Sequence, residues 1–110
     1  MSIEVAKYAI VITTCPNEEE ATRLAAALVE KKLAACVQAS NIISTYRWKG
    51  VIETGREVRL LIKAKRADYE AIEASIKSML SYENPEVLAI PVIAGSPLYL
   101  DWIDTETRRQ

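Results

Sequence analysis

The chain has 110 residues, half of them apolar, and a formal net charge of −1 from 14 basic and 15 acidic side chains. This length fits one domain, residues 1–110, that buries a core without disulfides or metal, and the balanced charge argues against nucleic acid or a membrane surface as the main partner. Histidine is absent, which removes the commonest general base and metal ligand and excludes serine–histidine, cysteine–histidine and HExxH chemistry.

The first third of the chain predicts a strand followed by a helix. Residues 8–14 (YAIVITT) are apolar and β-branched, without a polar face, which is typical of a strand covered on both sides or lying inside a sheet. Asn17, with Glu20 three residues later, predicts a helix start of the capping-box type. Apolar residues then recur at helical spacing up to Lys31 and Lys32, whose charges suit the last turn of a helix.

A long hairpin follows the helix. Residues 35–48 and 51–65 both have strand patterns, and Lys49-Gly50 is the expected turn between them. Polar residues at 38–41 predict a bulge or a bend in the first of these strands. In the second strand apolar and charged residues alternate, so we expect one buried face and one wet face that carries Lys65.

The remaining residues predict a helix, a strand and a short C-terminal helix. Asp68 is the expected N-cap of the first helix. Residues 86–92 (EVLAIPV) predict a strand, and Pro91 makes it an edge strand or an interrupted one. Pro97 suits the first position of the C-terminal helix. The polar tail, residues 105–110, is expected to fray.

The order strand, helix, two strands, helix, strand is that of the ferredoxin-like βαββαβ fold, an α+β fold with an antiparallel sheet. The right-handed crossover rule places the third strand between the first and the second, and the fourth strand on the other side of the first. Cys15, Tyr82 and Glu86 should therefore gather at one end of the sheet, and the hairpin turn should point out of that same end.

The hairpin is too long for the two helices to cover. Fourteen strand residues span roughly 45 Å, whereas a helix of about 15 residues spans only about 22 Å. The outer half carries Tyr46, Trp48, Val51 and Ile52, and an exposed apolar arm of this kind requires a partner. We therefore expect a closed homo-oligomer with these four residues at its interface. The alternatives are a hairpin that curls back on its own domain, and aromatic side chains that bind a ligand between subunits.

Several motifs resemble the CutA family of divalent-cation tolerance proteins, in register over nearly the whole chain. They are ITTCP at 12–16, LAACV at 33–37, TYRWKG at 45–50, YENPEV at 82–87 and YLDW at 99–102. The resemblance implies a homotrimer with the ferredoxin-like fold, similar in architecture to the PII signalling proteins. It also implies a role in tolerance of copper or other divalent cations.

The sequence departs from this family at the proposed copper site. The family commonly has His-Pro-Tyr before the last strand, where this chain has Leu-Ser-Tyr at 80–82. Of the proposed ligands Cys15 remains, and one thiolate does not make a selective divalent site. Glu86 is the second candidate ligand, at the same end of the sheet. The alternatives are that Cys15 is a small buried hydrophobe and that Glu86 pairs with Arg47 or Lys63 across a subunit boundary.

The leading functional prediction is a non-enzymatic, trimeric CutA-like protein linked to divalent-cation (copper) tolerance, with weak or altered metal binding because the histidine is missing. The alternative is a PII-like sensor that binds a small anionic ligand in clefts between subunits, although the chain has three glycines and no glycine-rich phosphate loop. An enzyme would need a nucleophile–base pair, and an RNA-binding sheet would need exposed aromatic residues on its central strands.

We expect a cytoplasmic location from the first residues of the chain, its lack of a long apolar stretch and its two cysteines. The first residues lack the basic start and apolar run of a signal peptide, and no apolar stretch approaches the roughly 20 residues of a membrane span. Cys15 and Cys36 are far apart in the sequence and are expected to be free thiols in a reducing compartment.

Overall fold

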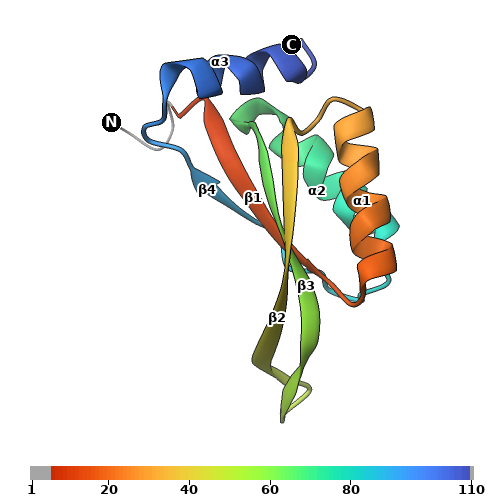
Figure 1. Cartoon of the computed structure of the whole chain (residues 1–110). Coiled ribbons are helices and arrows are strands. Elements are labelled where there is room, and N and C mark those ends of the chain that lie inside the picture. The colour runs from red at the N-terminus through yellow and green to blue at the C-terminus, as the bar shows by residue number, and fades with distance from the viewer. Residues whose placement is uncertain (1–5, 110) are drawn as a thin grey trace.

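Four antiparallel strands form one sheet in the order β2-β3-β1-β4 (Figure 1). The computed structural model describes residues 6–109. The elements are β1 (Tyr8–Cys15), α1 (Glu18–Glu30), β2 (Cys36–Trp48), β3 (Val51–Lys65), a short 3₁₀ turn (Arg66–Asp68), α2 (Tyr69–Met79), β4 (Leu88–Pro91) and α3 (Pro97–Glu106). The predicted α+β class and strand order are confirmed, with β3 in the middle and β4 at the edge beside β1.

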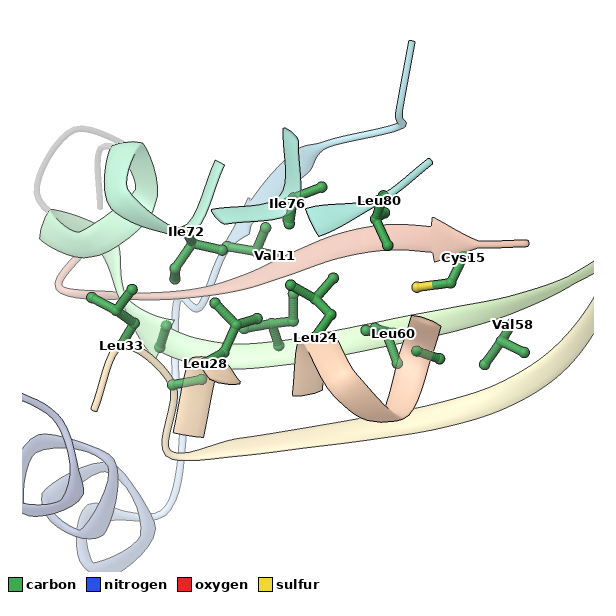
Figure 2. Close-up of a cluster of buried hydrophobic side chains, with 14 residues drawn as sticks. Val11, Cys15, Leu24, Leu28, Leu33, Val58, Leu60, Ile72, Ile76 and Leu80 are labelled. Carbon is green, nitrogen blue, oxygen red and sulfur yellow. The ribbon is translucent and has the colours of Figure 1, made fainter. Parts of the chain in front are cut away.

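The core lies between the sheet and the two helices α1 and α2, which cover one of its faces (Figure 1). Alternate residues of β3 point into it, among them Leu60 and Ile62, as the sequence pattern predicts. Leu24 and Leu28 from α1 and the isoleucines of α2 meet them, and all are fully buried (Figure 2). Each such side chain contributes about 1.5–3 kcal/mol relative to exposure, so this layer is the main source of stability.

The start of α1 is capped as predicted, but Glu20 has a different role. The side chain of Asn17 accepts a hydrogen bond from the backbone N–H of Glu20 at 2.9 Å. The Glu20 carboxylate accepts bonds from the backbone N–H and the hydroxyl of Ser81, at 2.8 and 2.9 Å. These bonds, led by the one from the Ser81 backbone, lower the pKa of the Glu20 carboxyl. Glu20 therefore ties the start of α1 to the segment that follows α2.

The β2–β3 hairpin has an unbroken register, from Cys36 opposite Lys63 to Trp48 opposite Val51. The bulge predicted at residues 38–41 is therefore wrong. All four residues are exposed on edge strand β2, and three of them are polar for that reason, not because the strand is interrupted. The turn has φ of 51° at Lys49 and 83° at Gly50, which is the type I′ geometry that matches the twist of a hairpin.

The outer half of this hairpin extends beyond the rest of the fold as a two-stranded arm, residues 42–57 (Figure 1). β1 ends at Cys15, opposite Val58, so within the described residues the arm part of β3 has a paired neighbour only in β2. The arm does not curl back on its own domain, and the expected uncovered arm is confirmed (Figure 1). The molecule accordingly measures 44 × 30 × 21 Å.

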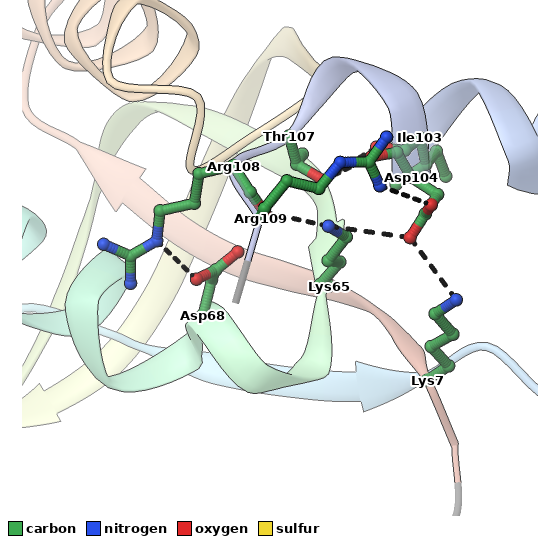
Figure 3. Close-up of polar contacts among 8 residues, drawn as sticks. All are labelled: Lys7, Lys65, Asp68, Ile103, Asp104, Thr107, Arg108 and Arg109. Atoms are coloured by element: carbon green, nitrogen blue, oxygen red, sulfur yellow. Dashed lines mark hydrogen bonds and ion pairs between the residues drawn. The ribbon is translucent and has the colours of Figure 1, made fainter.

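The C-terminal segment lies across the end of the sheet opposite the hairpin turn, where the sequence pattern predicted fraying (Figures 1 and 3). Thr107 is buried, and the backbone N–H of Arg108 donates to the carbonyl oxygen of Lys32 at 2.8 Å. Fraying is therefore wrong for residues 105–109, and Gln110 lies outside the described residues. The polar composition of this segment wrongly predicted fraying, because groups distant in the sequence supply its hydrogen-bond partners.

Two charged residues beneath this segment also differ from expectation (Figure 3). Lys65 is buried, since its Nζ donates to the carbonyl oxygen of Arg108 at 2.9 Å and lies 3.5 Å from an Asp104 carboxylate oxygen. Asp68 occupies the N-cap position of α2, as predicted, but its side chain makes no capping bond; it is buried and accepts from Arg108 Nε at 2.8 Å. Both residues serve to hold α3 and the tail.

Candidate functional site

The end of β1 and the segment before β4 meet at one end of the sheet, as predicted. The Thr13 hydroxyl donates to the backbone carbonyl of Glu86 at 2.7 Å. The Tyr82 hydroxyl donates to a carboxylate oxygen of Glu57, on β3, at 2.6 Å. The segment after α2 thus passes under the end of β1 and is fixed to the base of the arm.

An open cavity of about 620 Å³ occupies this corner. It forms because β3 continues past the end of β1, so the free edge of the arm and the segment before β4 enclose a notch. The aromatic residues of its wall are Tyr46, Trp48 and Tyr82, and its carboxylates are Glu57, Glu83 and Glu86. One guanidinium, that of Arg47, also lines it. Carboxylates and aromatic rings therefore dominate the wall.

Tyr82 and Glu57 form the inner, half-buried part of this wall. Burial, and then the hydrogen bond to Glu57, raise the pKa of the Tyr82 hydroxyl well above its ordinary value. The phenol therefore keeps its proton and holds one oxygen of Glu57 in place. This pair was not singled out from the sequence, because Glu57 belongs to an alternating charged face and its partner lies 25 residues further on; no local signal marks it.

The outer rim carries an ammonium group that belongs to the chain itself. Lys49, in the hairpin turn, has its Nζ 3.9 Å from a carboxylate oxygen of Glu83. The same Nζ lies 5.5 Å from the centroid of the Trp48 ring, within the range of a cation–π contact. All three groups are at the surface, so the pair is weak; it places one ammonium group beside an indole ring and a carboxylate.

Cys15 lies on the other side of β1 from this cavity, inside the core. It is fully buried, and its sulfur points into the cluster that Leu60 and Leu80 share (Figure 2). Burial, with smaller contributions from Glu20 and Glu57, raises the pKa of the Cys15 thiol to about 11. Since the thiolate is the form that binds metals, this side chain is poorly suited to be a ligand at neutral pH.

Glu86, the second predicted ligand, has an exposed side chain. Among residues 6–109 no group of three or more Cys, Asp and Glu side chains is arranged to hold a metal ion. The donor set of residues 6–109 therefore does not fit a divalent metal, and within this range Cys15 and Glu86 are not joined by a third ligand.

The predicted interface residues are all exposed in the single chain. Ile52 is 63% exposed and Trp48 is 37% exposed; Tyr46 and Val51 lie between these values. Tyr46, Trp48 and Val51 point to the face of the hairpin opposite α1 and α2, and Ile52 points to the other face, because side chains alternate along the paired strands. The structure thus places apolar side chains on both faces of the arm.

Fold and site together define a ferredoxin-like α+β protein with an overlong β2–β3 arm and an aromatic, carboxylate-lined cavity at the base of that arm. The model of the family described as CutA1 divalent ion tolerance protein matches residues 9–106. The chain therefore belongs to the CutA1 divalent ion tolerance family.

Relatives in this family are similar over most of the chain. Protein CutA of Mus musculus is 45% identical over 95 residues, which cover 86% of this chain and 54% of the mouse protein. The chain thus spans little more than half the length of the first curated relatives it matches.

Two solved structures agree with this fold. CutA1 from Shewanella sp. SIB1 has a TM-score of 0.91 and 42% identity, covering 94% of this chain and 98% of that one. The periplasmic divalent cation tolerance protein CutA from Archaeoglobus fulgidus has a TM-score of 0.89 and 38% identity, covering 90% and 97%. In residues 6–109 no helix is long and apolar enough to cross a membrane.

Proposed function

We propose that this chain acts in divalent-cation tolerance as a non-enzymatic homotrimer, with copper as the first cation to test. Membership of a family named for divalent ion tolerance supports the cation link. The observation that carries the assembly is the arm, which projects uncovered and exposes apolar side chains on both faces. A two-stranded ribbon of this length is marginal in water without packing against something else, and another copy of the chain is the simplest partner.

A second surface supports the same assembly. Leu88 and Ile90 of edge strand β4 point to the sheet face that α1 and α2 leave open, and both are about half exposed. Ile93, just after β4, is 70% exposed. Stable interfaces bury about 800 Å² per partner, so a larger apolar surface favours assembly. The arm and this apolar edge together offer such surface at two separate places. Contacts at two places suit a closed ring better than a single-patch pair.

The cation link does not rest on a metal site within one chain. Cys15 is buried with a raised pKa, and the described residues hold no three-ligand group. We therefore expect weak metal binding by the isolated chain. The alternative of an anion-binding sensor similar to PII receives no support from the cavity at the base of the arm, because three carboxylates and one guanidinium line it.

The mass of the assembled protein, measured by size-exclusion chromatography with light scattering, tests the proposed assembly. Trp48→Glu places a charge on the arm and should dissociate the oligomer or abolish soluble expression. The matched control is Ala74→Glu, which adds the same charge to an exposed position on α2 and should leave the mass unchanged. A Trp48→Glu protein of normal assembled mass would contradict the proposed interface.

The proposed compartment is the cytoplasm, supported by two free cysteines, Cys15 and Cys36, that a reducing environment would keep as thiols. The A. fulgidus relative is described as periplasmic. Fractionation of the native host decides between the two: recovery with periplasmic markers would overturn the proposal.

A further inference from the structure

The cavity at the base of the arm carries an excess of negative charge that the chain itself leaves largely uncompensated. Glu57 and Glu86 form no ion pair with any lysine or arginine among the described residues, and Glu83 has only the long contact to Lys49. Glu57 also contributes to the raised pKa of Tyr82 and of Cys15, as expected of a negative field in this corner. A positively charged ligand in this cavity is therefore stabilised by the carboxylates, whereas a neutral or negative ligand is not.

The form of that cation follows from the rest of the wall. A divalent metal needs several oxygen, nitrogen or sulfur ligands converging on one point, and no such group exists in residues 6–109. Aromatic faces are not ligands for a divalent metal ion, but they attract an alkylammonium group, which gives up its hydration more readily than a divalent metal ion does. Tyr46 and Trp48 provide such faces beside the carboxylates. A volume of about 620 Å³ is also far larger than a metal ion requires and lies in the range of small-molecule sites.

Lys49 supplies an internal example of this recognition. Its ammonium lies 5.5 Å from the Trp48 ring centroid and 3.9 Å from Glu83, so an indole face and a carboxylate already share one primary ammonium at the cavity mouth. Because the Lys49 side chain is well exposed and its contact to Glu83 is long, the pair is weak, and a free cation can displace this ammonium.

We propose that this cavity binds a small organic ammonium ion, with half-buried Glu57 as its counter-ion and the Trp48 ring as its cation–π contact. Tyr82 holds the Glu57 carboxylate in position through the 2.6 Å hydrogen bond. The proposal goes beyond divalent-cation tolerance and does not depend on it. Because Trp48 is also a proposed interface residue, the proposal requires one face of its ring to stay open in the assembled protein while the rest of the side chain contacts another subunit. The tests therefore use the full chain in its native assembly.

The first test compares three probes of equal chain length: n-butylammonium, n-butanol and butyrate. The chain has two tryptophans, and Trp102→Phe leaves Trp48 as the only indole reporter. n-Butylammonium should change the Trp48 emission with saturation, and should bind at least about tenfold more tightly than n-butanol, while butyrate should have no effect. Equal responses to amine and alcohol, a preference for butyrate, or no saturable response would overturn the proposal. Calorimetry on the unsubstituted protein gives the same comparison if Trp102→Phe fails to fold.

The second test uses charge variants within the same cavity. Glu57→Gln keeps an oxygen that accepts from Tyr82 but removes the charge, and should weaken n-butylammonium binding at least about fivefold. Lys49→Gln removes the tethered competitor and should tighten binding about two- to threefold. Glu106→Gln, at an exposed position on α3, is the matched control and should leave n-butylammonium binding unchanged.

Weaker binding by Lys49→Gln, or unchanged binding by Glu57→Gln, would overturn the assignment. The assembled mass of Glu57→Gln should equal that of the parent protein. A change in n-butylammonium binding with an unchanged mass therefore reports on the cavity, and a changed mass reports on the proposed trimer.

Discussion

At the scale of single residues, Cys15 shows how position overrides chemical type. A thiol at a strand end just before a helix N-terminus is a setting that often lowers a cysteine pKa. Here the side chain points into the core and the adjacent carboxylates oppose ionisation, so the pKa rises to about 11. Packing is therefore the role of Cys15 that the structure supports.

Removing the thiol should cost stability and spare metal binding. Cys15→Ala leaves a small cavity in the core and should lower the free energy of unfolding by about 1–2 kcal/mol, measured by denaturant unfolding. Copper and zinc affinity, measured by calorimetry, should not change. Cys36→Ala, at a half-buried position, is the comparison and should cost less. A loss of metal affinity in Cys15→Ala alone would show that Cys15 is a ligand after all.

The same thiol predicts a dependence of stability on alkaline pH. In the folded protein the pKa of Cys15 is raised from its ordinary 9.0 to about 11, so the unfolded chain releases this proton first. The stabilisation is fully present below about pH 9 and is lost as pH rises toward 11. The free energy of unfolding should fall over this window, and less steeply in Cys15→Ala. Parallel pH profiles for the two proteins would contradict the assigned pKa shift.

At the scale of elements, the C-terminal segment is held by contacts from distant parts of the chain (Figure 3). The Arg108 side chain is 47% exposed and pairs with fully buried Asp68, whereas that of Arg109 is 72% exposed and pairs with Asp104 at the surface. Arg108→Gln should lower the free energy of unfolding by about 1–3 kcal/mol, and Arg109→Gln by less than about 1 kcal/mol. Hydrogen exchange of α3 should accelerate in the first variant. Equal effects of the two substitutions would show that the buried carboxylate does not anchor the tail.

The hairpin turn offers a second test at this scale. Gly50 has φ of 83°, and a Cβ added there meets nothing within 4 Å, so Gly50→Ala tests backbone conformation alone. It should lower the free energy of unfolding by about 1–2 kcal/mol. Gly55→Ala, also in open space but without positive φ, is the control and should be neutral or slightly stabilising. A neutral Gly50→Ala would contradict the type I′ geometry.

Local signals in the sequence predict much of this fold, and distant contacts account for the rest. The Asn17 cap, the Lys49-Gly50 turn and the alternation along β3 depend on neighbouring residues, and the structure confirms them. Buried Lys65 and the Glu57–Tyr82 pair depend on partners more than 20 residues away. Periodicity contains no information about such partners, so the sequence located the end of the sheet that holds the cavity but not the pair that organises its wall.

At the scale of the whole molecule, the arm and the edge of β4 leave apolar surface at two separate places on one small chain. A monomer that exposes them would be prone to aggregation, whereas three copies in a closed ring would each supply partners for both. The cavity at the base of each arm would then lie beside a subunit boundary, which connects ligand binding to assembly. The proposed ring would explain why the arm is longer than its own helices can cover.

Native mass spectrometry of the purified chain tests this account most directly. The account predicts one dominant species at three times the 12.3 kDa chain mass, present without added metal. A monomer at 12.3 kDa that stays soluble and folded at micromolar concentration would contradict it, because the exposed arm would then need no partner.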